Sequence, residues 1–214
     1  MVDIHLSIGH LDRLVELDLG YFKSLTNLPS MTTEMECLTI LNLEGCLKLR
    51  NIPEFKGIME SLSKLFLGYT AMNELPPSSI ECLIALTLLD LSGCENLECL
   101  PSNMDSLRSL EKLILSGCSK LANLPENLWK LKRLKKLYLS GMSRLEEMGL
   151  TGISCLSSLK YLALSDDSFV TLPTSISQLS KLEALDLCHC NNLQTLLELP
   201  STVRYVCMLK SVIL

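Results

Sequence analysis

The sequence predicts an α/β fold in which one short unit repeats along a solenoid. The motif LxxLxL returns every 24 residues from Leu17 to Leu137, and a period of about 20 to 29 residues is the signature of leucine-rich repeats. Two apolar residues lie two positions apart in each copy, as in a β-strand, and a Leu-Pro dipeptide follows in most units. We therefore expect a curved right-handed horseshoe with a parallel β-sheet on its concave face and short helices, 3-10 turns and loops on its convex face.

The repeats extend along nearly the whole chain of 214 residues. After Leu137 the same position recurs at Leu162, at Leu185 and, in a degenerate copy, at Val206. This spacing predicts about nine units, and because a solenoid grows by adding units we expect residues 1–214 to form a single leucine-rich-repeat domain.

Both ends of the array look incomplete. Residues 1–11 form a partial repeat, in which Ser7 to Leu11 matches the back half of a unit. Residues 199–214 form a degenerate last repeat without the polar cap that solenoids need. We expect a fragment or a truncated product of a longer protein, with further domains upstream and downstream.

Each unit begins with its strand. In Leu113-Ile114-Leu115 the two leucines share one face and the residue between them takes the other. The leucines therefore point to the core, and Ile114 faces solvent. Because no unit can bury its leucines alone, one strand from each unit must stack in parallel on the next.

The second half of each unit returns the chain along the convex side. Leu124-Pro125 marks its start, because proline fixes φ and withholds a hydrogen-bond donor. Apolar residues three apart follow at Leu128, Leu131 and Leu134, as on one stripe of a short helix. The same dipeptide or its Ile variant recurs at Leu28-Pro29, Ile52-Pro53, Leu75-Pro76, Leu100-Pro101 and Leu172-Pro173.

Composition and charge narrow the class of protein. The mean hydropathy is +0.31, yet no uninterrupted run of about 18 apolar residues could span a bilayer, so we expect no membrane span. A net charge of -5 and 5% aromatic residues provide no basic footprint, so we expect no nucleic-acid partner.

The ten cysteines follow the repeat rather than a disulfide framework. Four of them fall five residues after the first strand leucine, which predicts a structural ladder of buried thiols that donate weakly to a neighbouring turn carbonyl. This cysteine column comprises Cys46, Cys94, Cys118 and Cys190, with Phe22, Thr70, Met142, Asp167 and Ser211 in the other units. We see no pairing among Cys37, Cys82, Cys99, Cys155, Cys188 and Cys207, so we expect reduced cysteines and an intracellular protein.

Neither a metal site nor a catalytic site is expected. Cys188-His189-Cys190 is the one metal-like cluster in the sequence, and its one-residue spacing lacks the second ligand pair of a zinc motif. We interpret His189 as a solvated turn residue. The three histidines of the sequence supply no set of nucleophile, base and orienting group. We therefore expect no cofactor and no enzymatic activity.

Two columns of strand positions face solvent on the concave side and are free to carry function. The third strand position holds Asp18, Asn42, Phe66, Asp90, Ile114, Tyr138, Ala163, Asp186 and Cys207. The first strand position holds Glu16, Ile40, Lys64, Leu88, Lys112, Lys136, Tyr161, Ala184 and Tyr205.

The central units combine exposed apolar and aromatic side chains with positive charge, as in an interface core with an electrostatic rim. The predicted protein-binding residues are Lys64, Phe66, Tyr69, Leu88, Lys112, Ile114, Lys136, Tyr138 and Tyr161. The positive charge predicts a partner with an acidic surface. Asp18, Asp90 and Asp186 interrupt the basic stripe, which disfavours nucleic acid. The alternative is an ordinary exposed sheet surface without a partner.

The unit resembles that of a known family. From Leu83 to Pro101 it reads as LxxLxxLxLxGCxxLxxLP, which is similar to the repeat of plant intracellular immune receptors of the TIR-NB-LRR class, the class of the tobacco mosaic virus resistance protein N group. The phrase Leu-Ser-Gly-Cys, at Leu91–Cys94 and Leu115–Cys118, carries the resemblance. Extracellular plant repeats have asparagine in the cysteine column instead.

The resemblance implies a protein-recognition and regulatory module of an intracellular receptor. Such a module senses a pathogen effector or a modified host protein, and it restrains an attached nucleotide-binding domain. The implied location is the cytoplasm or the nucleus. A stand-alone adaptor or enzyme inhibitor would use the same face without regulating an attached domain. An extracellular ectodomain is disfavoured, because the sequence has no Asn-x-Ser/Thr site.

Overall fold

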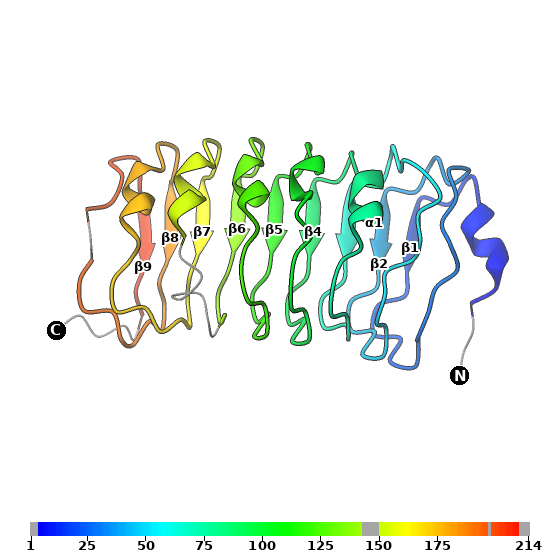
Figure 1. Ribbon diagram of the computed structural model, residues 1–214, viewed down its shortest axis with the longest axis horizontal. Helices are drawn as coiled ribbons and strands as arrows, with labels where there is room; N and C mark the ends of the chain where they lie inside the picture. The colour runs from blue at the N-terminus through cyan, green and yellow to red at the C-terminus, as the bar shows by residue number, and fades with distance from the viewer. Residues whose placement is uncertain (1–3, 143–149, 197, 210–214) are drawn as a thin grey trace.

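The computed structural model places nine parallel strands side by side in one sheet, in their order along the chain (Figure 1). It describes residues 4–142, 150–196 and 198–209. The strands are β1 (Glu16–Asp18), β2 (Ile40–Asn42), β3 (Lys64–Phe66), β4 (Leu88–Asp90), β5 (Lys112–Ile114), β6 (Lys136–Tyr138), β7 (Tyr161–Ala163), β8 (Ala184–Asp186) and β9 (Tyr205–Cys207). This arrangement confirms the predicted α/β leucine-rich-repeat solenoid.

Neighbouring strands pair at equivalent positions of successive units. Leu17 of β1 pairs with Leu41 of β2, and the same pairing continues to Leu185 of β8 and Val206 of β9. The strands stay in register although the last three intervals are 25, 23 and 21 residues instead of 24. The loops therefore absorb the changes in length, because a slip of one residue in a strand would turn its leucine to solvent.

The central strand residues build one continuous core. They are buried from β1 to β8, with Leu17 at 7% exposure and Leu185 at 1%. In β9 the equivalent Val206 is 40% exposed, and the following Leu209 is 71% exposed. The last described strand is thus the least well packed.

Short helices form a second row along the solenoid (Figure 1). Pro76, Pro125 and Pro173 stand immediately before three of them, with φ between -61° and -67°, so these three Leu-Pro dipeptides mark helix starts as predicted. No helix begins in residues 30–63, all of which the structure describes, so none follows Leu28-Pro29 or Ile52-Pro53. The helices are η1 (Leu6–His10), α1 (Pro77–Cys82), η2 (Met104–Ser106), η3 (Glu126–Lys130), η4 (Thr151–Cys155) and η5 (Thr174–Gln178). No helix in the described part of the chain is long and apolar enough to cross a membrane.

A left-handed turn follows each strand from β1 to β8. It lies four residues after the central strand residue, at Tyr21, Gly45, Tyr69, Gly93, Gly117, Gly141, Asp166 and His189, where φ lies between 55° and 75°. Glycine adopts this conformation without steric cost, which explains the recurrent Gly before the cysteine column. At Gly93 a Cβ would also collide with the ring of Tyr69.

The thiols of the cysteine column lie inside the core. Cys46, Cys94, Cys118 and Cys190 are buried. Each donates through Sγ to the carbonyl of a residue in the preceding unit, Leu19, Leu67, Leu91 and Leu164 respectively, at 3.1 to 3.2 Å. Burial raises the pKa of all four thiols, and it raises the pKa of Cys118 to about 12. These thiols therefore stay protonated at neutral pH.

The prediction that Cys188 and Cys207 are unpaired is wrong. They form a disulfide that joins the segment after β8 to the end of β9, across 19 residues of sequence. The register of the shortened last unit places Asp186 opposite Cys207, which brings Cys188 to a Cα separation of 5.5 Å from Cys207. That separation is ordinary for a disulfide. The other eight cysteines are free.

Candidate protein-binding face

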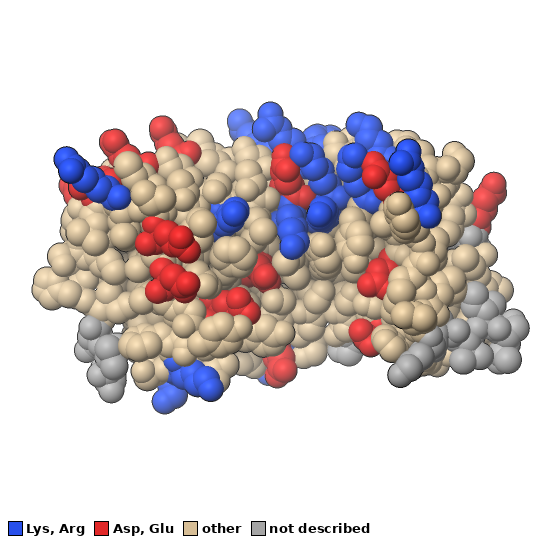
Figure 2. Space-filling view, turned by 180° about the vertical axis from the view of Figure 1, so that it is seen from behind, with Lys and Arg blue, Asp and Glu red and all other residues tan. Residues whose placement is uncertain are grey.

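The first and third residues of the strands form a continuous surface, here called the sheet face, which is the side seen in Figure 2. Lys64 and Lys136 are exposed on it, and the remaining strand residues of the predicted site are partly exposed. These are Phe66, Leu88, Lys112, Ile114, Tyr138 and Tyr161. The pairing of β3 to β7 brings all eight onto adjacent strands.

Three side chains at the centre of this face stack on one another. The rings of Tyr138 in β6 and Tyr161 in β7 lie with their centroids 4.9 Å apart and their planes at 38°. Lys112 Nζ of β5 stands 5.0 Å from the centroid of the Tyr138 ring, which is within the range of a cation–π contact. Partial burial raises the pKa of both tyrosines, and for Tyr161 the charges of Asp186 and Tyr138 add to it. The three residues form a preorganised aromatic and cationic cluster, which we call the Lys112–Tyr138–Tyr161 cluster.

The other predicted residues extend this cluster along the strands. Ile114 pairs with Tyr138 in the next strand, and Leu88 lies between Lys64 and Lys112. Phe66 pairs with Asn42 and Asp90 on its two sides. Apolar groups and lysines therefore share the surface of five neighbouring strands, together with Asp90.

Tyr69 lies apart from the strand residues. It occupies the left-handed turn after β3, with φ of 55°, and its ring packs against Gly93 of the next unit. It is 52% exposed. Tyr69 therefore belongs to the row of turns that borders the sheet face, and not to the strand surface itself.

Ala163 departs from the prediction that the third strand position faces solvent. It is 2% exposed. Its methyl group lies in β7 between the larger side chains of Tyr138 and Asp186, with which it pairs. Ala163 therefore adds almost no exposed surface to the sheet face.

Aspartate and asparagine at the third strand position cap the following turn. Oδ1 of Asp18, Asn42, Asp90 and Asp186 accepts the backbone N–H of the residue two positions later, at 2.8 to 3.0 Å. This local hydrogen bond stabilises a turn in the way expected of Asn and Asp side chains. Phe66 and Ile114 have no side-chain acceptor at the same position. The units of Phe66 and Ile114, on either side of the unit of Asp90, therefore have a partly exposed apolar group in place of this turn cap.

The charges follow the two columns. Asp18, Asp90 and Asp186 lie at the third strand position, and Lys64, Lys112 and Lys136 lie at the first, so the acidic and basic side chains occupy neighbouring columns of the same face. Figure 2 shows Lys and Arg gathered along the upper edge of this face.

The basic edge also carries acidic groups. Lys135 pairs with Glu111 at 2.8 Å and Lys160 with Glu183 at 2.7 Å. The Lys160 ammonium lowers the pKa of the Glu183 carboxyl. Among the described residues neither Lys112 nor Lys136 takes part in such an ion pair. Lys112 belongs to the aromatic cluster, and Lys136 lies between Lys112 and Tyr161.

A single sheet of nine parallel strands, one from each repeat, defines the class of leucine-rich-repeat solenoids. Residues 33–212 match the family profile described as "Disease resistance protein RPS4B-like, leucine-rich repeats". The chain belongs to this family of plant disease resistance proteins.

Two plant relatives cover most of the chain. Disease resistance protein RPS4B of Arabidopsis thaliana is 33% identical over 96% of this chain and 19% of its own length. TMV resistance protein N of Nicotiana glutinosa is 32% identical over 87% of this chain and 14% of its own length. The chain therefore spans less than a fifth of either relative, and the resemblance to the TIR-NB-LRR class is confirmed.

A solved structure shows the same fold outside plants. A leucine-rich-repeat protein of Leptospira interrogans superposes with a TM-score of 0.54 at 24% identity, covering 97% of this chain and 63% of that protein. At this identity the similarity concerns the fold alone.

Proposed function

We propose that this chain is the recognition module of an intracellular plant immune receptor, acting in the cytoplasm or the nucleus. It binds a pathogen effector or a modified host protein through the sheet face. In the full-length receptor it restrains the attached nucleotide-binding domain, and its own role is not enzymatic. Membership of the disease resistance family supports the receptor context.

The main support for the binding proposal is the kind of residue found at the third strand position. Four units place a turn-capping Asp or Asn there. Phe66, Ile114 and Tyr138 replace that cap in the central units, although an exposed apolar side chain gains nothing from water. Departures from a local structural rule concentrate at functional sites.

The geometry of the cluster favours a protein partner with an acidic surface. Tyrosine side chains are typical of interface cores, because each buries a large area and has few rotatable bonds. Lys112 is already placed against the Tyr138 ring, so it loses little conformational freedom when a partner binds. A carboxylate of the partner would then find Lys64, Lys112 and Lys136 aligned in three of four successive strands.

Paired variants test this proposal. Binding of candidate effectors is measured by surface plasmon resonance with the wild-type chain, with Phe66→Ala/Tyr138→Ala and with Tyr21→Ala. Tyr21 is the matched control, because it is an exposed tyrosine in the turn row, outside the predicted site. Each of the two truncations, at Phe66 and at Tyr138, is expected to cost about 2 kcal/mol, or about 30-fold in Kd. Unchanged affinity of the double variant would refute the site.

The restraining role needs a separate measurement. Replacing this module in the full-length receptor by an unrelated leucine-rich-repeat array is expected to produce defence signalling without an effector. A receptor that remains silent after the exchange contradicts the restraint, and it leaves the binding site to be judged by the affinity data alone.

A further inference from the structure

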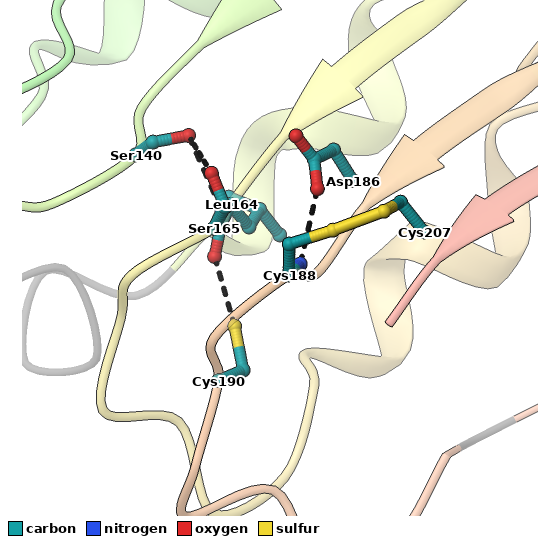
Figure 3. The surroundings of a disulfide bond; sticks show 7 residues. All are labelled: Ser140, Leu164, Ser165, Asp186, Cys188, Cys190 and Cys207. Carbon is teal, nitrogen blue, oxygen red and sulfur yellow. Dashed lines mark hydrogen bonds between the residues drawn. A yellow bond between two sulfur atoms is a disulfide. The ribbon is translucent and has the colours of Figure 1, made fainter. Parts of the chain in front are cut away.

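Three side chains of types that can ligate a metal ion converge at the end of the sheet face, outside the Lys112–Tyr138–Tyr161 cluster (Figure 3). Asp186 ends β8, Cys188 follows two residues later, and Cys207 ends β9. Their ligand atoms all lie within 4.8 Å of one another, and all three residues are partly exposed. Among the described residues they form the one group of three His, Cys, Asp or Glu side chains placed to share an ion.

We propose that Cys188, Cys207 and Asp186 bind a thiophilic divalent cation, typified by Zn²⁺, when the two thiols are reduced. The same two cysteines form the disulfide when they are oxidised. The last strand is then joined to its neighbour in both states, by a sulfur–sulfur bond or by the metal.

The donor set fits zinc. Two thiolates and one carboxylate provide three protein ligands, and a water molecule completes the tetrahedron in zinc sites with three protein ligands. With Zn–S distances of about 2.3 Å, the two sulfur atoms of a tetrahedral site lie about 3.8 Å apart. The sulfur atoms of Cys188 and Cys207 therefore have to separate on reduction, which rotation of two partly exposed side chains allows.

Asp186 is held in place for this role by its own turn. Its Oδ1 accepts the backbone N–H of Cys188 at 3.0 Å, so the carboxylate is fixed against the residue that supplies the first thiol (Figure 3). Outer hydrogen bonds of this kind orient metal ligands. Oδ2 of the same carboxylate remains as the oxygen that can bind the ion.

The neighbouring residues of the Cys-His-Cys run do not belong to the site. Cys190 is buried and its Sγ donates to the carbonyl of Leu164 at 3.1 Å, on the core side of the sheet. His189 occupies the left-handed turn with φ of 61°. The cross-strand pair, rather than the local run, is therefore the ligand set.

The position of the site explains why a cross-link matters there. Val206 in β9 is 40% exposed, whereas Leu185 at the equivalent position of β8 is 1% exposed. Strand β9 buries little apolar area, and it depends more than the other strands on bonds to its neighbour. A covalent or metal link between Cys188 and Cys207 supplies such a bond.

The oxidised chain reaches the zinc-bound state in two steps, which are reduction of the disulfide and binding of the ion. A dithiol reductant transfers two electrons and two protons to the disulfide, and the reductant itself becomes a disulfide. Binding of Zn²⁺ then displaces the two thiol protons to solvent, because the thiolate is the ligand. In the reverse direction a disulfide oxidant accepts two electrons from the zinc-bound thiolates and, with two protons from solvent, becomes a dithiol, while Cys188 and Cys207 form their disulfide and Zn²⁺ is released.

Zinc titration of the reduced and the oxidised chain tests the proposal. The exposed thiols are first removed by Cys37→Ser, Cys99→Ser and Cys155→Ser, and this background is reduced with a dithiol that is then removed by gel filtration without oxygen. Calorimetry is expected to show one equivalent of Zn²⁺ bound by the reduced background and none after oxidation. Hydrogen exchange at residues 203–207 is expected to slow by tenfold or more when Zn²⁺ is added to the reduced protein.

Two variants in the same background separate the metal site from the disulfide. Cys207→Ser is expected to lose both the disulfide and the zinc. Asp186→Asn keeps both thiols, and it is expected to form the disulfide and bind Zn²⁺ at least tenfold more weakly. A reduced background that binds no more Zn²⁺ than its Cys207→Ser version overturns the proposal, and so does an unchanged zinc affinity in Asp186→Asn.

Discussion

Asp167 is a buried carboxyl group whose protonation should affect the stability of the fold. It occupies the cysteine column, is 6% exposed, and uses Oδ1 to accept the backbone N–H of Met142 at 3.0 Å. Oδ2 has no hydrogen-bond partner among the described residues. Burial, with a smaller contribution from the Asp166 charge, raises the pKa of the Asp167 carboxyl to about 8, although the Met142 N–H opposes the rise.

This shift makes stability fall as pH rises. The folded chain keeps the proton up to about pH 8, whereas an aspartate in the unfolded chain loses it near pH 3.9. Between about pH 4 and 8 unfolding therefore releases a proton, and the free energy of unfolding decreases by about 1.4 kcal/mol per pH unit. From pH 5 to 7 this single group costs about 3 kcal/mol.

The variant Asp167→Asn tests this reasoning. Asn keeps an acceptor for the Met142 N–H and cannot ionise, so the stability of the variant relative to the wild-type chain is expected to rise by about 3 kcal/mol from pH 5 to pH 7. Urea unfolding at pH 5, 6 and 7 measures the difference, with Asp166→Asn as the control at the exposed neighbouring carboxyl. A wild-type chain and an Asp167→Asn variant with parallel pH profiles would refute the buried, protonated carboxyl.

Three further predictions follow from the core, the turns and the thiols. Leu113→Ala removes a fully buried strand leucine, and urea unfolding should show a loss of about 3 kcal/mol or more; a loss below 1 kcal/mol would contradict the packing. Gly117→Ala should lower the free energy of unfolding by about 1 to 2 kcal/mol, because Gly117 has a φ of 75°. His189→Gly should raise the free energy of unfolding, because His189 has a φ of 61°. Changes of the opposite sign would show that the turn is not left-handed. Iodoacetamide should label the exposed Cys99 in the folded chain and label the buried Cys94 only after unfolding, as mass spectrometry can show.

The regular part of the fold follows directly from the sequence. The positions of Leu17 and its equivalents predict every strand of the described residues, because each central residue points to the core and its two neighbours lie on the opposite face, where Ala163 alone is buried. The Leu-Pro dipeptides predict the starts of α1, η3 and η5 for a similarly local reason. Patterns of this kind depend on a few adjacent residues and on nothing distant.

The features that the sequence pattern missed depend on pairing across units. The contact of Tyr138 with Tyr161 links different strand positions in consecutive strands, so no single column reveals it. The disulfide requires the register of the shortened last unit, which only the paired strands β8 and β9 define. The turn-capping role of Asp18 and Asp90 had a local signal, an acceptor two residues before a turn N–H, which could have separated structural from binding positions.

The central claim is that the aromatic and lysine residues of the sheet face bind a protein partner. The most direct measurement is the Kd of one effector or host protein for Tyr138→Ala/Tyr161→Ala and for the control Tyr21→Ala, relative to the wild-type chain. We predict a loss of 30-fold or more in the first variant and a change of less than threefold in the control. Wild-type affinity in the double variant, or an equal loss in the control, would contradict the claim.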